Sequence, residues 1–344
     1  MEEEIGKILF EYLKKLSPGT PLRSVINDLI HSHLGALIVI DNPEVQKIIE
    51  GGFRVNCRFT PQRLFELCKM DGAIIISYDL KRILYANVLL IPDNSIYSSE
   101  TGTRHKAGEK TAKQADTLVI AVSERKRKTT LYLGKLKYTL KTSSEIIRDL
   151  STALQVLEKQ REIFDDLLSK LNILEISDLV SVSDVCKVIQ RAEMILKISE
   201  TIKKSFTELG KEGNIINMRY KELIRNIEKS EEEIIRDYAA ISLKKAKKIL
   251  QNITFEGVLD LEPIARLLIE KSSEESIQAA GFRFLSHLKL NEKEISQIVS
   301  RFENLNNLLE AQQEQLEEVL KNRTEAVKKE INLLREKILS GKII

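Results

Sequence analysis

The chain has 344 residues, of which 42% are hydrophobic and 5% aromatic, and it carries no tryptophan. This length predicts two or three domains, and the low aromatic content with only 6 prolines favours helices and argues against an all-β fold. The net charge of +3 is too small for a protein that binds nucleic acid along its whole length. No apolar run approaches the roughly 20 residues that span a bilayer, so we expect a cytoplasmic protein with no membrane contact.

Residues 1–142 alternate between helical and strand patterns. The run from Ala36 to Ile40 is too short for a helix, and its neighbours Gly35 and Asp41 are typical of turns, so it predicts a buried strand. By the same reasoning we expect helices over 5–13, 22–34 and 61–70, and strands over 36–40, 73–77, 83–91, 117–122 and 129–133, with an edge strand over 135–140. The region therefore predicts a mixed α/β domain.

From residue 143 onward the sequence pattern predicts helices. Thr142 and Glu145 form a capping box, and the apolar residues after it recur at steps of three and four along one long helix. A second helix is expected over 184–209, ended by Gly210, and a third over 214–250 with a break near Ser230 left open. A coiled coil would give the same stripe, but bundle packing is the more ordinary outcome. Further helices are expected over 262–271, 274–288, 292–309 and 313–339.

We therefore expect an α+β/α chain of three parts. These are a mixed α/β domain over 1–142, an all-α bundle over 143–255 and an all-α C-terminal domain over 256–344.

Asp71, Gly72 and Ala73 form the first candidate motif. They place one carboxylate on a turn ahead of an apolar run, beside two residues small enough to let another group approach the backbone. Such a carboxylate can hold Mg²⁺ or Mn²⁺ or assist a ribose hydroxyl. On these three residues alone a simple turn aspartate is the better interpretation, because Asp-Gly is a common turn pair.

The segment from Gly102 to Lys106 forms the second candidate motif. It precedes a predicted helix over 107–115, for which Thr103 is a natural N-cap. The amides of a first helical turn attract phosphate, Arg104 offers a planar fork, and His105 can donate a hydrogen bond or bind metal. A capped surface helix with ordinary charges would explain Arg104 and Lys106 easily and His105 less well.

Together these residues resemble the diadenylate cyclase family, which joins two ATP molecules into cyclic di-AMP. The matching segments, in order, are Met70 to Ile74, Tyr85 to Val88, Pro92-Asp93, Glu100 to His105, Glu109, Lys113-Gln114 and Ala121 to Ser123. The helical middle, from Glu208 to Gly213 and from Met218 to Tyr238, is similar to the DNA-integrity scanning members of that family.

The resemblance implies a set of site residues and partners. Two ATP molecules, one on each of two facing subunits, would react with Mg²⁺ or Mn²⁺ present, in an assembly that is an octamer in the family. Asp71, Arg104 and His105 would be catalytic, and Asp71 and His105 would be the residues near the metal. The nucleotide would contact Gly72, Ala73, Leu90, Gly102, Thr103, Arg104, His105, Lys106, Ala107 and Ser123.

The chain departs from the family pattern in two places. Lys106 stands where the family usually has arginine, which keeps the charge and loses the bidentate fork. The C-terminal hairpin expected at residues 319–323 lacks the glycines whose amides would bind DNA, since no glycine occurs between Gly281 and Gly341. We therefore expect weak DNA binding, with one continuous helix over 313–339 as the simplest structure.

Several interpretations stay open from sequence alone. Besides the enzyme, the chain could be a nucleotide sensor without turnover or a DNA-scanning scaffold. The basic run from Arg125 to Lys128 fits phosphate contacts or, more simply, a solvated hairpin tip. His31 and His33 are poor co-ligands, because residues two apart point to different faces of a helix, and His287 fits a structural role.

Overall fold

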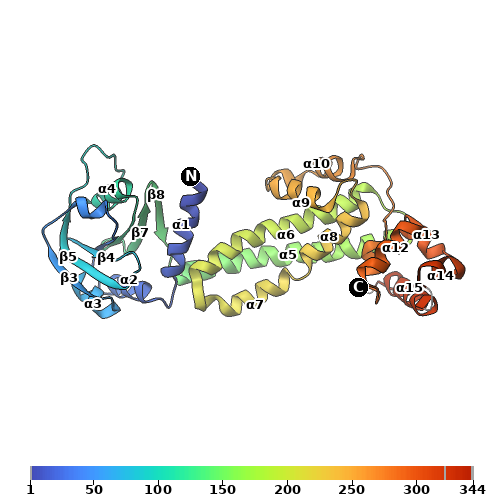
Figure 1. Cartoon of the computed structure of the whole chain (residues 1–344), viewed down its shortest axis with the longest axis horizontal. Coiled ribbons are helices and arrows are strands. Elements are labelled where there is room, and N and C mark those ends of the chain that lie inside the picture. Colours follow the sequence, from blue (N-terminus) through green and yellow to red (C-terminus); the bar gives the residue numbers. More distant parts are fainter. Residues whose placement is uncertain (1, 321–322, 342–344) are drawn as a thin grey trace. The chain divides into compact units, whose positions relative to one another are not determined.

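The computed structural model describes residues 2–320 and 323–341. The chain forms two compact units (Figure 1). Unit 1 comprises Met1–Leu150 with Lys204–Ile215, and unit 2 comprises Ser151–Lys203 with Ile216–Ile344. The expected α+β/α fold class is confirmed, while the three domain boundaries remain a prediction.

Unit 1 is built on a twisted mixed sheet. Its strands are β1 (Ala36–Ile40), β2 (Ile49–Glu50), β3 (Phe53–Arg58), β4 (Ala73–Ile76), β5 (Arg82–Leu90), β6 (Leu118–Ser123), β7 (Lys128–Leu133) and β8 (Leu136–Leu140). Its helices are α1 (Glu2–Lys15), α2 (Pro21–His31), α3 (Pro61–Leu67) and α4 (Thr103–Ala115), with a 3₁₀ turn η1 (Val45–Lys47). The strand order is β2-β5-β4-β1-β6-β7-β8, and β3 also pairs with β5.

Helices cover both faces of this sheet. Because successive side chains of β1 alternate, Ile38 and Ile40 pack with α1, α2 and α3 on one face, while Leu37 and Val39 pack with α4 on the other. β1, β4 and β6 are buried almost throughout, which agrees with their continuous apolar runs. The α4 face is the one that carries the candidate motif at its first turn.

The two short strands β2 and β3 were not predicted. β3 alternates between exposed and half-buried positions at the margin of the sheet, so its sequence lacks the apolar run that identified the other strands. Its pairing with β5 depends on partners distant in the chain.

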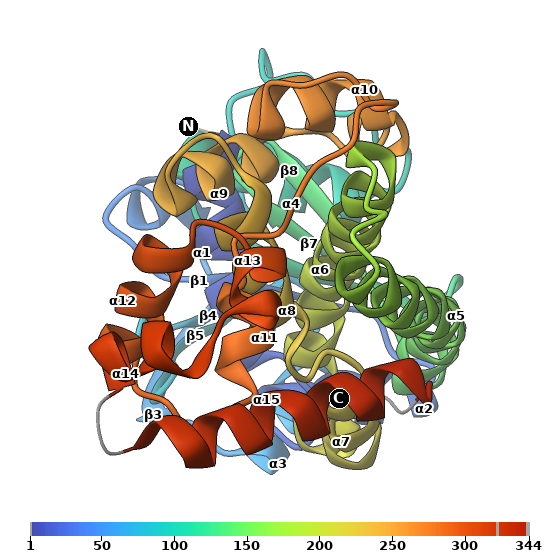
Figure 2. The ribbon, with the colours of Figure 1, turned by 90° about the vertical axis from the view of Figure 1, so that its right-hand side faces the viewer.

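Unit 2 is helical, and two long helices contribute to both units. They are α5 (Ser143–Ile176) and α6 (Val182–Leu209), which lie side by side where Arg191 donates to Gln160 Oε1 (Figures 1 and 2). The capping box before α5 is confirmed, because Thr142 N donates to Glu145 Oε2 over 2.8 Å and Glu145 N donates to Thr142 Oγ1 over 3.2 Å. Gly210 ends α6 with φ +57°, as expected.

The helix expected over 214–250 consists of three helices. They follow a 3₁₀ turn, η2 (Gly210–Gly213), and are α7 (Asn214–Leu223), α8 (Ile227–Tyr238) and α9 (Leu243–Asn252). The breaks lie on either side of Ser230, not at it. Between α7 and α8, Asn226 adopts the left-handed region at φ +63°. Between α8 and α9, Ala240 N donates to Leu268 O instead of to a carbonyl of the helix.

The C-terminal helices are shorter than expected. A 3₁₀ turn, η3 (Gly257–Leu259), comes first. The helices are α10 (Leu261–Ile264), which continues into a π turn η4 (Ala265–Ile269), α11 (Phe282–Ser286), α12 (Glu292–Phe302), α13 (Leu305–Glu310), α14 (Gln313–Leu320) and α15 (Thr324–Leu339). The expected helix over 274–288 is mostly wrong, because Ile277 N donates to Val180 O in an extended pairing. The single helix over 313–339 is also wrong, although residues 321–322 lie outside the described residues.

No helix in the described part of the chain is both long and apolar enough to cross a bilayer.

A pair of buried carboxyl groups in unit 2 makes stability depend on pH. Glu231 on α8 is 2% exposed and Glu193 on α6 is 6% exposed. Burial, together with the neighbouring Glu193, raises the pKa of Glu231 well above its ordinary value of 4.5, although Lys247 opposes the shift. Burial also raises the pKa of Glu193, against the charge of Lys197. The raised pKa values favour the protonated form of this pair in the folded protein at pH values above 4.5.

We expect the folded protein to lose stability as the pH rises from the ordinary carboxyl pKa of 4.5 through the raised pKa values of this pair. A raised folded pKa contributes stability fully below the unfolded value and loses it as pH rises through the folded value. Glu231→Gln should remove this loss and raise the free energy of unfolding by about 1–2 kcal/mol at alkaline pH. Urea unfolding of both proteins at pH 5 and pH 9 checks this, and identical pH dependence in the two would contradict it.

Candidate active site

Four strand ends meet at one edge of the sheet in unit 1. β1 runs parallel to β4, with Leu37 beside Ala73, and antiparallel to β6, with Ala36 beside Val122. Ala73 is also paired with Val88 of β5. The residues before β1 and β4, and those after β5 and β6, therefore gather at this edge, which is where both candidate motifs lie.

Gly72 is required by its surroundings. Its φ is +88°, a conformation that side chains rarely adopt, and a Cβ atom there would lie 2.9 Å from both Asn87 C and Val88 O. Asp71 is exposed beside it. Ala73 is buried in the apolar layer beneath α4.

The second motif opens α4 one turn earlier than expected. Gly102 is the N-cap, with φ −82° and ψ 135°, and Thr103 is the first helical residue, so the predicted N-cap role of Thr103 is wrong. The first helical bond runs from Lys106 N to Gly102 O over 2.8 Å. The amides of the residues between them have no intrahelical acceptor, as in any first turn, and can face an anion.

Arg104 is held at the edge of the sheet by Gly35. A Cβ atom on Gly35 would overlap with the Arg104 guanidinium, so the guanidinium rests directly on the backbone before β1. The charge of Arg104 also reaches Cys68, at the end of α3, where it opposes the burial that raises the pKa of the thiol to about 12. The Arg104 side chain thus extends from α4 to Gly35, and its charge is felt at the end of α3.

His105 packs edge-on to Tyr132, with ring centroids 6.5 Å apart and planes at 83°. Burial lowers the pKa of His105, and the charge of Arg104 lowers it further, although Glu100 opposes both. The lowered pKa favours the neutral imidazole at pH 7, which has one donor and one acceptor nitrogen.

The loop that leads into α4 is fixed by the helix itself. Glu109 accepts hydrogen bonds from Ser98 Oγ over 2.5 Å and Ser99 N over 3.1 Å, and Lys113 Nζ lies 2.7 Å from its other oxygen. Lys110 Nζ donates to Asn94 O over 2.9 Å. These contacts engage the side chains of Glu109, Lys110 and Lys113 and hold the loop before α4 against the helix.

A cavity of about 630 Å³ opens at this turn. It is lined by Gly102, Thr103, Arg104, His105 and Ser123, all predicted site residues, and also by His33, Glu124, Arg125 and Arg127. Asp71, Gly72, Ala73, Leu90, Lys106 and Ala107 do not line it. Ala73 and Leu90 are buried in the layer beneath α4, with Ala107 packed against it, while Lys106 is exposed.

The described residues hold no group of three or more His, Cys, Asp and Glu that could by itself bind a metal. A lone carboxylate such as Asp71 instead fits Mg²⁺ or Mn²⁺ held mainly by phosphate oxygens and water. The assignment of Asp71 and His105 to a metal stays a prediction.

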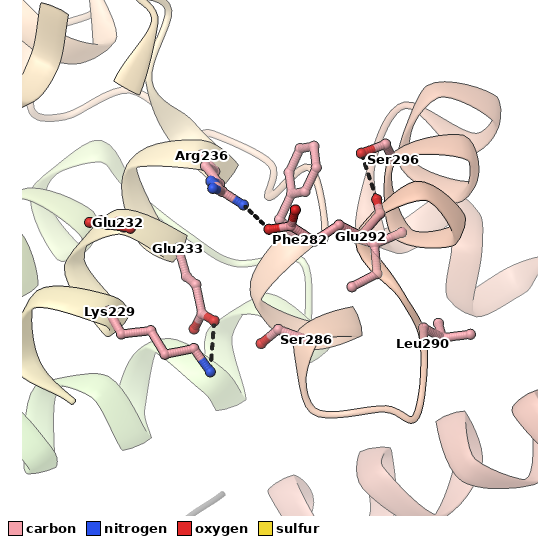
Figure 3. Close-up of a pocket in the computed structure, with 10 residues that line it drawn as sticks. Lys229, Glu232, Glu233, Arg236, Phe282, Ser286, Leu290, Glu292 and Ser296 are labelled. Carbon is pink, nitrogen blue, oxygen red and sulfur yellow. Dashed lines mark hydrogen bonds and ion pairs between the residues drawn. The ribbon is translucent and has the colours of Figure 1, made fainter. Parts of the chain in front are cut away.

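A second cavity, of about 670 Å³, lies in unit 2 between α8, α11 and α12. Figure 3 shows two pairs of its charged side chains facing each other. Lys229 Nζ lies 3.6 Å from Glu233 Oε1, and Arg236 Nη1 lies 3.7 Å from Glu292 Oε1. Because its cations are engaged with its own acids, this cavity offers less to a phosphate than the one at α4.

Comparison with known proteins identifies the family. The model of the DisA bacterial checkpoint controller nucleotide-binding domain matches residues 23–136, and that of the DisA bacterial checkpoint controller linker region matches residues 140–277. DNA integrity scanning protein DisA of Symbiobacterium thermophilum is 41% identical over 93% of this chain and 92% of that protein. DisA of Clostridioides difficile is 40% identical over 91% of this chain and 90% of that protein.

Among solved structures, DacA from Staphylococcus aureus shares 24% identity over 41% of this chain and 93% of that chain, with a TM-score of 0.32. The two DisA proteins match over nearly their whole length, and the two family models match in consecutive order. The chain therefore belongs to the DisA family of diadenylate cyclases.

Proposed function

We propose that this chain condenses two ATP molecules into cyclic di-AMP, with one ATP bound by each of two facing subunits. The observation that carries the proposal is the single cavity that brings together Thr103, Arg104, His105 and Ser123 at the first turn of α4. A helix N-terminus, a guanidinium fork and a neutral imidazole are suited to a triphosphate whose α-phosphate is attacked.

In this mechanism the chain mainly positions the reactants. The 3′-hydroxyl of each ATP attacks the α-phosphate of the other, a new P–O bond forms, and the bond between the α- and β-phosphates breaks to release pyrophosphate. Arg104 and His105, which line the cavity, stabilise charge on the α-phosphate. Asp71 lies outside that cavity, and its role, to receive the hydroxyl proton or to support the metal, is assigned from the family resemblance alone. Mg²⁺ or Mn²⁺, when bound, neutralises charge on the phosphate oxygens. Such positioning and charge stabilisation supply most of the rate in phosphoryl transfer.

Assembly follows from this scheme, because one domain holds only half of the reacting pair. We propose a homo-oligomer, an octamer by analogy with the family. Lys106 is exposed and does not line the cavity, so its presence in place of arginine removes no residue from the cavity lining. This favours an active enzyme over a nucleotide sensor.

Incubation of the purified protein with ATP and Mn²⁺ or Mg²⁺ tests the proposal. We expect cyclic di-AMP and pyrophosphate in a ratio of one to two, because two pyrophosphates leave for each product formed. Asp71→Asn should abolish both products while the oligomer mass is unchanged. ATP that binds but stays intact in the wild-type protein would favour the sensor instead.

Gly35→Ala should lower cyclic di-AMP formation by roughly 10²-fold with little change in melting temperature. The new Cβ occupies the place of the Arg104 guanidinium, which is a flexible end and can move, so the main cost is misplacement of a charged contact. Gly213→Ala is the matched control, because the atoms nearest to its Cβ, at 3.1–3.5 Å, belong to the side chains of Leu209 and Phe206. Equal activity in the two variants would contradict this role of Gly35.

A role in DNA scanning is the second candidate, since the relatives carry that name. We propose that DNA binding through residues 319–323 is weak. This segment contains no glycine, and its residues 321–322 lie outside the described residues. Arg323 is engaged within the chain, with Nη1 2.7 Å from Glu294 Oε1 and Nη2 2.6 Å from Lys289 O. Fluorescence anisotropy of the full chain with branched DNA should show no submicromolar binding at about 150 mM salt, and tight, salt-sensitive binding would contradict this.

A further inference from the structure

The hairpin between β6 and β7 carries cations that the family motif does not explain. The two strands separate after the pair Ser123 and Lys128, and Lys126 N donates to Ser123 Oγ over 3.2 Å. Arg127 adopts the left-handed region at φ +50°. Arg125 and Arg127 line the cavity at α4, whereas Lys128 does not.

Both guanidinium groups are uncommitted. No hydrogen bond or ion pair within residues 2–320 and 323–341 engages Arg125 or Arg127. Arg23 and Arg82, by contrast, donate to Lys141 O and Asn56 O within the same unit. Two free forks that face one cavity are poised for an anionic ligand.

The net charge of the residues that line the cavity also favours an anionic ligand. Arg104, Arg125 and Arg127 supply three positive charges and Glu124 one negative charge, a balance of +2 when His33 and His105 are neutral. The three arginines also differ in their exposure to solvent. Arg104 is half-buried against Gly35, whereas Arg125 and Arg127 are exposed at the hairpin tip.

We infer that Arg125 and Arg127 bind the β- and γ-phosphates of ATP, the part that leaves as pyrophosphate. This inference rests on the proposed function, which places the reacting α-phosphate beside Arg104 and His105. A triphosphate extending outward from there reaches the rim, where the two uncommitted arginines lie. They are positioning residues that select a nucleoside triphosphate over a monophosphate.

Binding measurements on the full chain test this without relying on turnover. Calorimetry with ATP, AMP and inorganic tripolyphosphate compares wild type with Arg125→Ala/Arg127→Ala. We expect ATP and tripolyphosphate to bind roughly tenfold more weakly, because each exposed charged contact contributes modestly, while AMP is unaffected. Lys128→Ala/Lys135→Ala is the matched control. It also removes two positive charges, but from exposed residues that do not line the cavity.

Two outcomes would overturn the inference. One is equal weakening of ATP and AMP by the arginine substitutions, and the other is an equal loss of ATP affinity in the lysine control. Glu124→Gln gives an independent check of the electrostatic effect. Because it removes the one negative charge that lines the cavity, it should tighten ATP binding. If the wild-type protein binds ATP in this pattern yet makes no cyclic di-AMP, the proposed function fails while the phosphate site stands.

Discussion

Replacement of Arg104 by alanine should lower the rate of cyclic di-AMP formation by roughly 10²–10³-fold. Arg104 is the half-buried cation of the cavity at α4, and its guanidinium rests on the backbone at Gly35, at the edge where the strand ends meet. Loss of one preorganised donor to a developing charge costs this much in other active sites. The measurement is product formation at saturating ATP.

Arg104→Lys separates charge from geometry. Lysine keeps the positive charge but cannot form two parallel hydrogen bonds, so its activity should fall between wild type and alanine. Melting temperatures of both variants exclude unfolding as the cause. If Arg104→Ala formed cyclic di-AMP at a rate within threefold of wild type, Arg104 would not be a catalytic residue.

Replacement of Arg283 by methionine should cost about 3–5 kcal/mol of unfolding free energy. Arg283 on α11 is 4% exposed, and its guanidinium donates to Asn172 and to Glu175 of α5. The carboxylate of Asp237 accepts from the backbone N atoms of Gly281, Phe282 and Arg283 at 2.6–3.0 Å, which fixes the start of α11. The variant would leave the Glu175 charge buried without its cation.

A double variant shows whether that uncompensated charge is the cause. Arg283→Met with Glu175→Gln removes the carboxylate charge, while the amide oxygen introduced at that position can still accept the hydrogen bond from the Tyr238 hydroxyl. It should recover at least half of the lost stability in urea unfolding. If the double variant were less stable than Arg283→Met alone, the loss would come from packing rather than from charge.

Much of the fold was predictable, because its signals are local. The apolar runs of β1, β4 and β6 and the capping box at Thr142 each lie within a few consecutive residues. The errors arose where distant partners decide the structure. β3 forms only against β5, and residues 274–280 pair with the chain near Val180 although their composition suits a helix.

The site was predictable to the extent that it is contiguous. Thr103, Arg104 and His105 are adjacent in the chain and together in the cavity. His33, Arg125 and Arg127 reach the same cavity from the α2–β1 turn and the β6–β7 hairpin. Only the antiparallel pairing of β1 with β6 brings those two segments together, and no spacing in the sequence reports it.

The central claim is that two copies of this domain complete each other's reaction, and dilution tests it most directly. Specific activity for cyclic di-AMP and the mass of the assembly are measured across the same range of protein concentration. We expect activity per chain to fall in step with dissociation and to vanish for the monomer. A monomer that retains full specific activity would contradict the account.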